Sequence, residues 1–237
     1  MKQPRVKHLS QFLAWCRERA SPETCSQYER YLARPLNPNN RWSVTAWKRY
    51  YRFLCEEKGD KRACEEFSKI RSKRSGSDLW VPPDSEIRRA LESPLGWLYS
   101  LLIQSGLRFS ELVRILEEAD RLEWYDGEGY SRVLLAWKRG SKRAFWGYFL
   151  QRVEPRPVSP DRLQDMRQAL GLPGFKYMRK WAATKMYEAG CGEAEVDFIQ
   201  GRTPDSVLRK HYLMIIGKAD ECYKRYAAWL RGWLVEL

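Results

Sequence analysis

Four cations and one tyrosine with the chemistry to act on a phosphodiester are spread along the chain. They are Arg108, Lys176, Arg179, Arg202 and Tyr212. Guanidinium and ammonium groups neutralise the negative charge that builds up around phosphorus in the transition state. A tyrosine oxygen can attack phosphorus and form a covalent link. The set therefore predicts a site that grips a phosphate and attacks it.

The spacing of these residues favours a shared site. Lys176 and Arg179 stand one helical turn apart, so both are expected on one side of a helix. Arg108 follows Ser105-Gly106, where the glycine is expected to end a helix. Arg108 is then placed just outside the N-terminus of the next helix, where the helix dipole also favours an anion.

Each candidate taken alone also has a structural explanation. Arg108 could pair with Glu111 or cap a neighbouring helix. Lys138, a further cation in a predicted hairpin, could be an exposed lysine at the end of a strand. Arg179 could belong to the solvated face of its helix, and Tyr212 could pack in the core. The order and spacing of the whole set favour the chemical interpretation over these.

The charge of the chain favours a polyanionic partner. The net charge is +13 and the pI is about 9.5, a balance typical of proteins that bind nucleic acid. Residues 1–74 hold 18 Lys and Arg against 8 Asp and Glu, and residues 75–237 hold 25 against 22. The N-terminal third is therefore expected to supply most of the electrostatic attraction.

The composition also predicts the compartment of the protein. The sequence contains no run of about 18 apolar residues that could span a membrane, and its first residues lack the apolar block of a signal peptide. We therefore expect a soluble protein without a membrane partner, cytoplasmic and associated with the nucleoid. Scarce asparagine and abundant charge lean toward a thermophile.

Six cysteines form no C-x-x-C pair, and two histidines are too few to suggest a zinc site. Buried, reduced thiols are the default expectation for an intracellular chain. Cys16 and Cys25 share their spacing with Cys55 and Cys64, so disulfides are conceivable if the source is a hyperthermophile.

Residues 1–74 are predicted to form a bundle of about four helices. The helices are expected at 6–20, 22–32, 43–58 and 60–71, with N-caps at Ser21 and Ser43 and a stop at Gly59. The candidate DNA-binding face of this bundle consists of Arg41, Lys48, Arg49 and Arg52, with Trp42 and Trp47 among them. The alternative is that the two tryptophans belong to the core.

Basic, small and proline residues in SKRSGSDLWVPP predict a linker, placed at 75–83, before a second region at 84–237. Strands are expected at 130–138 and 143–150, joined as a hairpin by the turn Arg139-Gly140-Ser141-Lys142. Helices are expected near 84–92, 95–104, 111–118 (capped by Ser110), 161–169, 175–189, 193–200, 204–216 and 218–235. The predicted fold class is mainly α with a small antiparallel β-sheet.

The order of these motifs resembles the tyrosine recombinase, or phage-type integrase, family. SGLRFSEL looks like the box that supplies the first catalytic arginine, at Arg108. AWKRGSKRAFW looks like the family's lysine hairpin, with Lys138 at the lysine position. FKYMRKWAAT looks like the second box, whose pattern His/Lys-x-x-Arg is filled by Lys176 and Arg179. The lysine in that box is similar to integrases of archaeal viruses and plasmids.

The last two positions of the family pattern fall in the C-terminal segment. IQGR places Arg202 where the family often has histidine or tryptophan, and Tyr212 stands at the nucleophile position. The exchange of both histidines for cations keeps positive charge and removes the imidazoles. The N-terminal bundle looks like the family's core-binding domain, and residues 84–237 look like its catalytic domain, of mixed α/β structure.

The resemblance implies site-specific cutting and rejoining of double-stranded DNA at attachment sites, through a 3′-phosphotyrosyl intermediate. It implies no metal and no nucleotide cofactor, with Lys138 as general acid and a homo-tetramer on DNA. Lys142 and Arg143, beside the hairpin turn, join the predicted DNA contacts. It leaves open whether the tyrosine acts on its own protomer's site or a neighbour's.

Other functions remain possible from the sequence. A topoisomerase-like protein with the same site would relax supercoiled DNA without needing two specific sites. A non-catalytic, sequence-specific DNA-binding protein could use the same fold, although the complete set of candidate residues speaks against it. Charge alone would also fit a basic RNA- or chromatin-binding protein.

Overall fold

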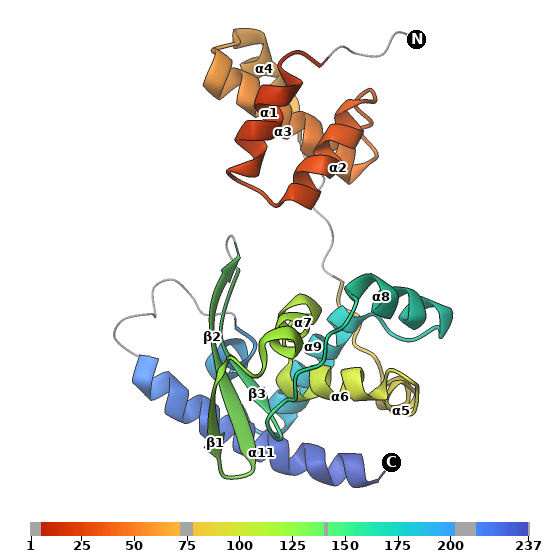
Figure 1. The fold of residues 1–237 in the computed structure, drawn as a ribbon, viewed down its shortest axis with the longest axis vertical. Coiled ribbons are helices and arrows are strands. Elements are labelled where there is room, and N and C mark those ends of the chain that lie inside the picture. The colour runs from red at the N-terminus through yellow and green to blue at the C-terminus, as the bar shows by residue number, and fades with distance from the viewer. Residues whose placement is uncertain (1–5, 72–77, 140–141, 202–211, 237) are drawn as a thin grey trace. The chain divides into compact units, whose positions relative to one another are not determined.

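The computed structural model describes residues 6–71, 78–139, 142–201 and 212–236, with the backbone alone for 138, 139, 142, 143 and 212–214. The chain divides into two compact units, Met1–Asp78 and Leu79–Leu237 (Figure 1). The division falls inside the segment predicted as a linker. Among the described residues, no helix is long and apolar enough to cross a membrane.

The N-terminal unit is a bundle of helices. Its helices are α1 (Leu9–Arg17), α2 (Pro22–Leu32), α3 (Arg41–Lys58) and α4 (Lys61–Lys69). Ser21 caps α2 and the left-handed Gly59 ends α3, both as predicted. The cap of α3 is Asn40 rather than Ser43, because the Asn40 side chain accepts from two backbone N–H groups of the first turn.

The core of this unit is aromatic and is crosslinked twice. Phe12 is fully buried and packs edge-on against Tyr50. Trp47 is 7% exposed and belongs to the core, whereas Trp42 is 46% exposed. The alternative that both tryptophans are core residues therefore holds for Trp47 and not for Trp42. Disulfides join α1 to α2 and α3 to α4; they are Cys16–Cys25 and Cys55–Cys64. The default expectation of reduced thiols is wrong for all four cysteines.

The C-terminal unit is mainly α with one small antiparallel sheet, which confirms the predicted fold class. Its elements are α5 (Asp84–Leu91), α6 (Gly96–Ser105), α7 (Phe109–Glu118), β1 (Glu123–Gly127), β2 (Tyr130–Arg139), β3 (Lys142–Phe149), α8 (Pro160–Ala169), α9 (Phe175–Glu188), α10 (Glu193–Ile199) and α11 (Tyr212–Val235). Helix α7 begins two residues before the predicted start, so Arg108 and not Ser110 is its N-cap residue.

The sheet has the strand order β1-β2-β3, and the edge strand β1 was not predicted. The hairpin of β2 and β3 was predicted, and an irregularity interrupts its register between Leu134 and Trp137. Ala136 lies in this interval with φ +48°, a left-handed conformation that is rare for a residue with a side chain. One extra residue in β2 therefore shifts the side-chain alternation just before Lys138.

Helix α11 is the longest element and passes across the sheet (Figure 1). A break was predicted between residues 216 and 218, but the helix runs without interruption through Gly217. A glycine costs about 1 kcal/mol in a helix interior, and the burial of Ala219, Tyr223, Tyr226 and Leu230 outweighs that cost. A third disulfide, Cys191–Cys222, joins this helix to the segment before α10 and corrects the remaining thiol expectation.

Candidate functional site

The turn between α6 and α7 presents Arg108. Gly106 ends α6 with φ +58°, and Leu107 is fully buried. Arg108 then leaves the core as the residue before α7, where its backbone N–H donates to Glu111 Oε2 at 2.9 Å. Its guanidinium Nη1 donates to Glu111 Oε1 at 2.5 Å. The ion pair predicted as an alternative is therefore present, and it orients the guanidinium beside the helix N-terminus.

Arg179 is packed against the same turn. Its side chain is buried, with the residue only 7% exposed, and Nη1 donates to the backbone oxygen of Gly106 at 3.1 Å. Aromatic packing brings α9 to this place, because Phe175 stacks on Phe109 with ring centroids 4.5 Å apart. The structure thus brings Arg179 to the turn that carries Arg108, although the two boxes lie far apart in the sequence.

Gln200, which the sequence reasoning missed, joins a third segment to this turn. The residue is fully buried at the end of α10, and its Nε2 donates to the backbone oxygen of Arg179 at 2.8 Å. A Cβ at Gly106 would lie 2.8 Å from the same Nε2, so glycine is required there for the close approach. The only signal was the position of Gln200 in IQGR, immediately before the predicted Gly-Arg turn.

Lys176 lies on α9 one turn before Arg179, as its spacing predicted, but the two side chains differ in burial. The side chain is exposed, and its Nζ lies 4.5 Å from the ring centroid of Tyr177. Arg179, three residues further along the helix, is buried. The structure places the two cations of the second box in different environments, one in the interior beside Gly106 and one on the surface.

The remaining candidates are placed through their backbones or lie outside the described residues. Lys138 pairs with Arg143, and Arg139 with Lys142, at the end of the hairpin; nothing is described of these side chains. Arg202 lies outside the described residues and directly follows the buried, left-handed Gly201. Tyr212 is the first residue of α11, and its backbone alone is described.

Two buried tyrosines attach α11 to α6, the helix that leads to Arg108. The Tyr223 hydroxyl donates to the backbone oxygen of Gln104 at 3.0 Å, and the Tyr226 hydroxyl donates to that of Ile103 at 2.7 Å. Burial raises the pKa of both phenols well above the usual value. Neither hydroxyl is exposed, and each is held by its hydrogen bond to α6.

A polar cluster ties α11 to the sheet. Arg132 Nη1 lies 2.6 Å from Asp220 Oδ2, and the Tyr148 hydroxyl donates to Asp220 Oδ1 at 2.9 Å. Burial and the Asp220 charge raise the pKa of Tyr130 to about 12. Both members of the ion pair are about four-fifths buried, so the carboxylate fixes α11 against β2 and β3.

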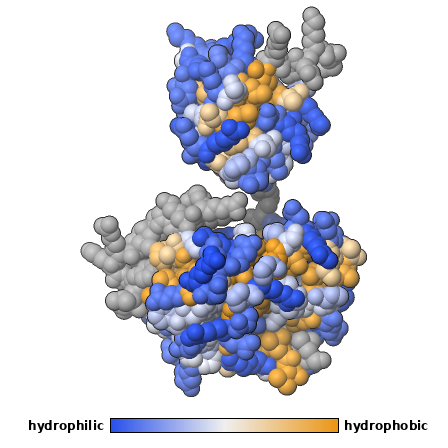
Figure 2. Space-filling view, viewed as in Figure 1, coloured by the Kyte–Doolittle hydropathy of each residue, from blue (hydrophilic) through white to orange (hydrophobic). Residues whose placement is uncertain are grey.

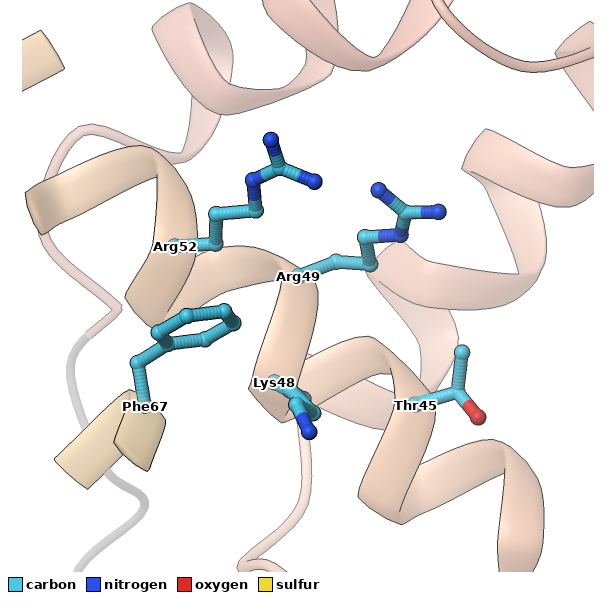
Figure 3. A pocket seen from close by; sticks show the side chains of 5 residues that line it. All are labelled: Thr45, Lys48, Arg49, Arg52 and Phe67. Carbon is cyan, nitrogen blue, oxygen red and sulfur yellow. The ribbon is translucent and has the colours of Figure 1, made fainter. Parts of the chain in front are cut away.

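A basic stripe runs along α3 in the N-terminal unit. Thr45, Lys48, Arg49 and Arg52 are spaced to share one helical face, and with Phe67 of α4 they line a pocket of about 280 Å³ (Figure 3). In Figure 3 the guanidinium groups of Arg49 and Arg52 point to the same side, away from Lys48. Three of the four cations predicted on α3 therefore line one pocket together with an aromatic ring, and Arg41 does not.

The cations of this stripe differ in their partners. Arg52 Nε lies 2.7 Å from Glu56 Oε1, and Lys48 Nζ lies 5.5 Å from the Phe67 ring centroid. Among the described residues Arg49 forms no ion pair, and it is exposed. Arg41, one turn before Thr45, is also exposed, and its backbone oxygen accepts from Thr45 Oγ1. Over the face drawn in Figure 2, hydrophilic surface predominates on this unit and surrounds a smaller hydrophobic patch.

The class of the protein follows from a match to a family model. A family model for archaeal phage integrases matches residues 79–229, well over half of the chain. No curated protein matches the chain. Among solved structures, the chain is similar to the integrase from mycobacterium phage Brujita, with 16% identity and a TM-score of 0.38 over 94% of this chain and 93% of that one. The family match spans the unit that holds Arg108, Arg179 and Gln200.

Proposed function

The chain belongs to the archaeal phage integrase family, and from that premise we propose that it is a site-specific tyrosine recombinase acting on double-stranded DNA. The observation that carries the proposal is the junction at Gly106, where Arg179 and Gln200 meet the turn that presents Arg108. Two guanidinium groups anchored to one turn form a preorganised receptor for a single phosphate.

The arginines are assigned to the scissile phosphate. Arg108 and Arg179 hold its non-bridging oxygens, and Arg202 adds a third cation. Planar guanidinium forks match two phosphate oxygens better than a point charge does. Lys176 is assigned to the surrounding DNA surface, where its exposed ammonium would contribute charge without entering the junction. That is a lesser role than its position in the second box suggested.

Tyr212 is assigned as the nucleophile. Its oxygen bonds to phosphorus as the phenolic proton passes to water, the bond to the 5′-oxygen breaks, and Lys138 protonates that leaving oxygen. A 3′-phosphotyrosyl link results, and attack by a 5′-hydroxyl of a second duplex reverses the step. Support comes from the other two tyrosines of α11. Tyr223 and Tyr226 are fully buried, and the hydroxyl of each donates to a backbone oxygen, so Tyr212 is the remaining candidate on that helix.

The N-terminal unit is assigned as the DNA core-binding domain. The stripe of Lys48, Arg49 and Arg52 would follow the phosphate backbone, with Arg41 extending it by one turn. Lys142 and Arg143 would contact the duplex from the hairpin of the catalytic domain. Phosphate contacts of this kind set affinity and register rather than sequence preference. Exchange between two cut duplexes would require four protomers assembled on DNA.

Covalent capture tests this function. A library of random duplexes, nicked on one strand so that cleavage cannot be reversed, is incubated with the protein and resolved on a denaturing gel. We expect an adduct with the wild-type protein and none with Tyr212→Phe, whose affinity for duplex DNA should be unchanged. Mass spectrometry of the adduct should identify Tyr212. An adduct formed by the Phe variant would assign the nucleophile elsewhere.

Two other outcomes would point to the alternatives. Binding of duplex DNA without any adduct from the wild-type protein would identify a non-catalytic DNA-binding protein. Rapid relaxation of supercoiled plasmids that lack the captured sequence would indicate a topoisomerase-like activity instead.

A further inference from the structure

Phe67 of α4 is an aromatic side chain that the core of the N-terminal unit does not use. Among the described residues packed in or on that core, the segment of α4 contributes Ala63 and Ile70 and not Phe67. The Phe67 ring is partly exposed, lines the pocket on α3 and has its centroid 5.5 Å from Lys48 Nζ. A ring at the edge of a basic pocket suits a ligand that is anionic in one part and apolar in another.

The ring lies between two groups of cations. In Figure 3 the Phe67 ring points into the space between Arg52 and Lys48, and the guanidinium groups of Arg49 and Arg52 point away from Lys48. The backbone of DNA has a matching order, because each deoxyribose presents carbon atoms between two phosphates. Proteins contact both the phosphates and the sugars of this backbone.

We propose that this pocket is a subsite for one deoxyribose of the DNA backbone and its two flanking phosphates, and that the Cys55–Cys64 disulfide keeps the subsite formed. The Phe67 ring packs on the sugar, Lys48 binds one phosphate and Arg49 binds the other. The inference rests on the function proposed above. It adds an apolar contact and a dependence on redox conditions to the stripe of cations on α3.

Packing alone holds α4 weakly on α3. The helix has nine residues, and Ala63 is its one buried residue. Helices of this length are marginal in isolation, and the burial of a methyl group adds little stability. The Cys55–Cys64 disulfide joins the two helices, and Cys64 lies three residues before Phe67, on the same face of α4. The disulfide therefore fixes the face of α4 that carries the ring.

The Cys55–Cys64 disulfide is also the most accessible of the three. Both of its cysteines are partly exposed, whereas the four cysteines of the other two disulfides are buried. Reduction requires a thiolate to reach a disulfide sulfur. A dithiol supplies two electrons and two protons, becomes a disulfide itself and leaves Cys55 and Cys64 as thiols. We expect this disulfide to open first, and the affinity for DNA to fall when it does.

Titrations of a labelled random duplex test the apolar contact. Phe67→Ala should weaken binding by about tenfold, as expected when the burial of one apolar side chain is lost. The slope of log K against log salt should not change, because no charge is removed. Phe67→Tyr keeps the ring and should bind as the wild type does. Leu36→Ala, which removes a side chain 38% exposed and outside the pocket, is the control. Equal affinities of Phe67→Ala and the wild type would overturn the subsite.

A double-mutant cycle tests the disulfide. The pair Cys55→Ser, Cys64→Ser should weaken binding as much as Phe67→Ala does. The three changes combined should weaken it no further, because all of them remove the same contact. The control pair Cys16→Ser, Cys25→Ser removes a disulfide of the same sequence separation from the same unit, and its affinity should be unchanged. Additive losses in the combined variant would overturn the role of the disulfide.

Stepwise reduction with dithiothreitol gives the same comparison where a serine variant does not fold. Alkylation and mass spectrometry identify the cysteines that are free at each step. We expect affinity to fall by about tenfold once Cys55 and Cys64 are reduced while the buried disulfides remain. Wild-type affinity at that step would overturn the proposal.

A comparison of affinity with cleavage separates this proposal from the function on which it rests. On saturating nicked duplex, Phe67→Ala should cleave at the wild-type rate, because only binding is weakened. A wild-type protein that binds no duplex would refute the proposed function. A wild-type protein whose binding Phe67→Ala leaves intact would refute the subsite alone.

Discussion

The guanidinium of Arg179 and the backbone carbonyl of Gly106 lie 3.1 Å apart, although 73 residues separate them in the chain. This bond fixes the C-terminal end of α6 to the interior face of α9. Arg108 follows two residues after Gly106, so the position of one arginine depends on the other. The junction is a shared support for both, and a substitution at Gly106 should affect cleavage while both arginines are kept.

We predict that Gly106→Ala impairs cleavage more than it impairs folding. An alanine with φ +58° costs about 1–2 kcal/mol, and its Cβ would also meet Gln200 Nε2 at 2.8 Å. Gln200 must then move and release the backbone of Arg179. We expect the free energy of unfolding of the C-terminal unit to fall by about 1–2 kcal/mol or more, and single-turnover cleavage to fall by about 10²-fold.

Gly171→Ala is the matched control. Gly171 lies in the same unit with φ +59°, and no atom lies within 4 Å of an added Cβ. It should therefore show the backbone cost alone, measured by urea unfolding, with an unchanged cleavage rate. Equal cleavage rates for the two variants would mean that the Gly106–Gln200 approach does not position Arg179.

We predict that Arg108→Lys separates phosphate binding from DNA binding. A lysine keeps the positive charge but loses the planar fork, and the loss of one transition-state donor typically costs about 10²–10³ in rate. Affinity for the duplex should change little. Arg114→Lys is the control, because Arg114 lies on α7 in an exposed pair with Glu118, where a lysine keeps the charge and loses only the stacking over Trp137. Comparable rate losses in both variants would remove the special role of Arg108.

Local sequence patterns predicted most of the helices but not every place where an element begins, ends or continues. Ser21 and Gly59 are residue types whose capping preferences act over a few neighbouring positions, and both cap as predicted. Gly217 has the same local preference, yet it lies inside α11 because the buried residues that follow decide the helix. Strand β1 was not predicted because Trp124 is its one partly buried residue, so its sequence shows no alternation of buried and exposed positions. Pairing with β2 forms the strand instead.

The sequence yields a set of candidate residues and not their geometry. The motif order makes Arg108 and Arg179 candidates, and their connection through Gly106 depends on the packing of Phe175 against Phe109. Gln200 was not among the predicted site residues, because a buried amide is uncharged and belongs to no charge pattern in the sequence. The shared spacing of Cys16–Cys25 and Cys55–Cys64 raised those two disulfides as an alternative, whereas Cys191–Cys222 was not considered, because its pairing depends on the distance between elements far apart in the sequence.

We predict that the C-terminal unit loses stability as the pH rises above 10. Burial and the Asp220 charge raise the pKa of Tyr130 to about 12 in the folded state, from 10.0 when unperturbed. Between these values the folded state binds more protons than the unfolded state, so the free energy of unfolding decreases with pH. The stabilising effect of the protonated phenol is complete below pH 10 and is lost as the pH passes 12.

Urea unfolding at a series of pH values measures this effect. Tyr130→Phe should make the decrease above pH 10 less steep, because one of the titrating groups is removed. Tyr187→Phe, which removes a hydroxyl from a side chain 48% exposed on α9, is the control. A decrease as steep in Tyr130→Phe as in the wild type would show that this phenol does not titrate with folding.

We predict that Arg49 contributes more than Arg52 to DNA affinity, although both line the pocket on α3. Arg52 is paired with Glu56 at 2.7 Å and must give up part of that interaction to bind a phosphate, whereas Arg49 forms no ion pair among the described residues.

Each phosphate contact adds about 0.9 to the slope of log K against log salt. Titrations of a labelled random duplex between about 50 and 200 mM salt should therefore show a slope reduced by about 1 for Arg49→Ala. The reduction should be smaller for Arg52→Ala and smallest for Lys58→Ala, which removes the same charge from α3 outside the pocket. Equal slopes for the three variants would mean that this stripe adds only general charge and does not bind phosphates individually.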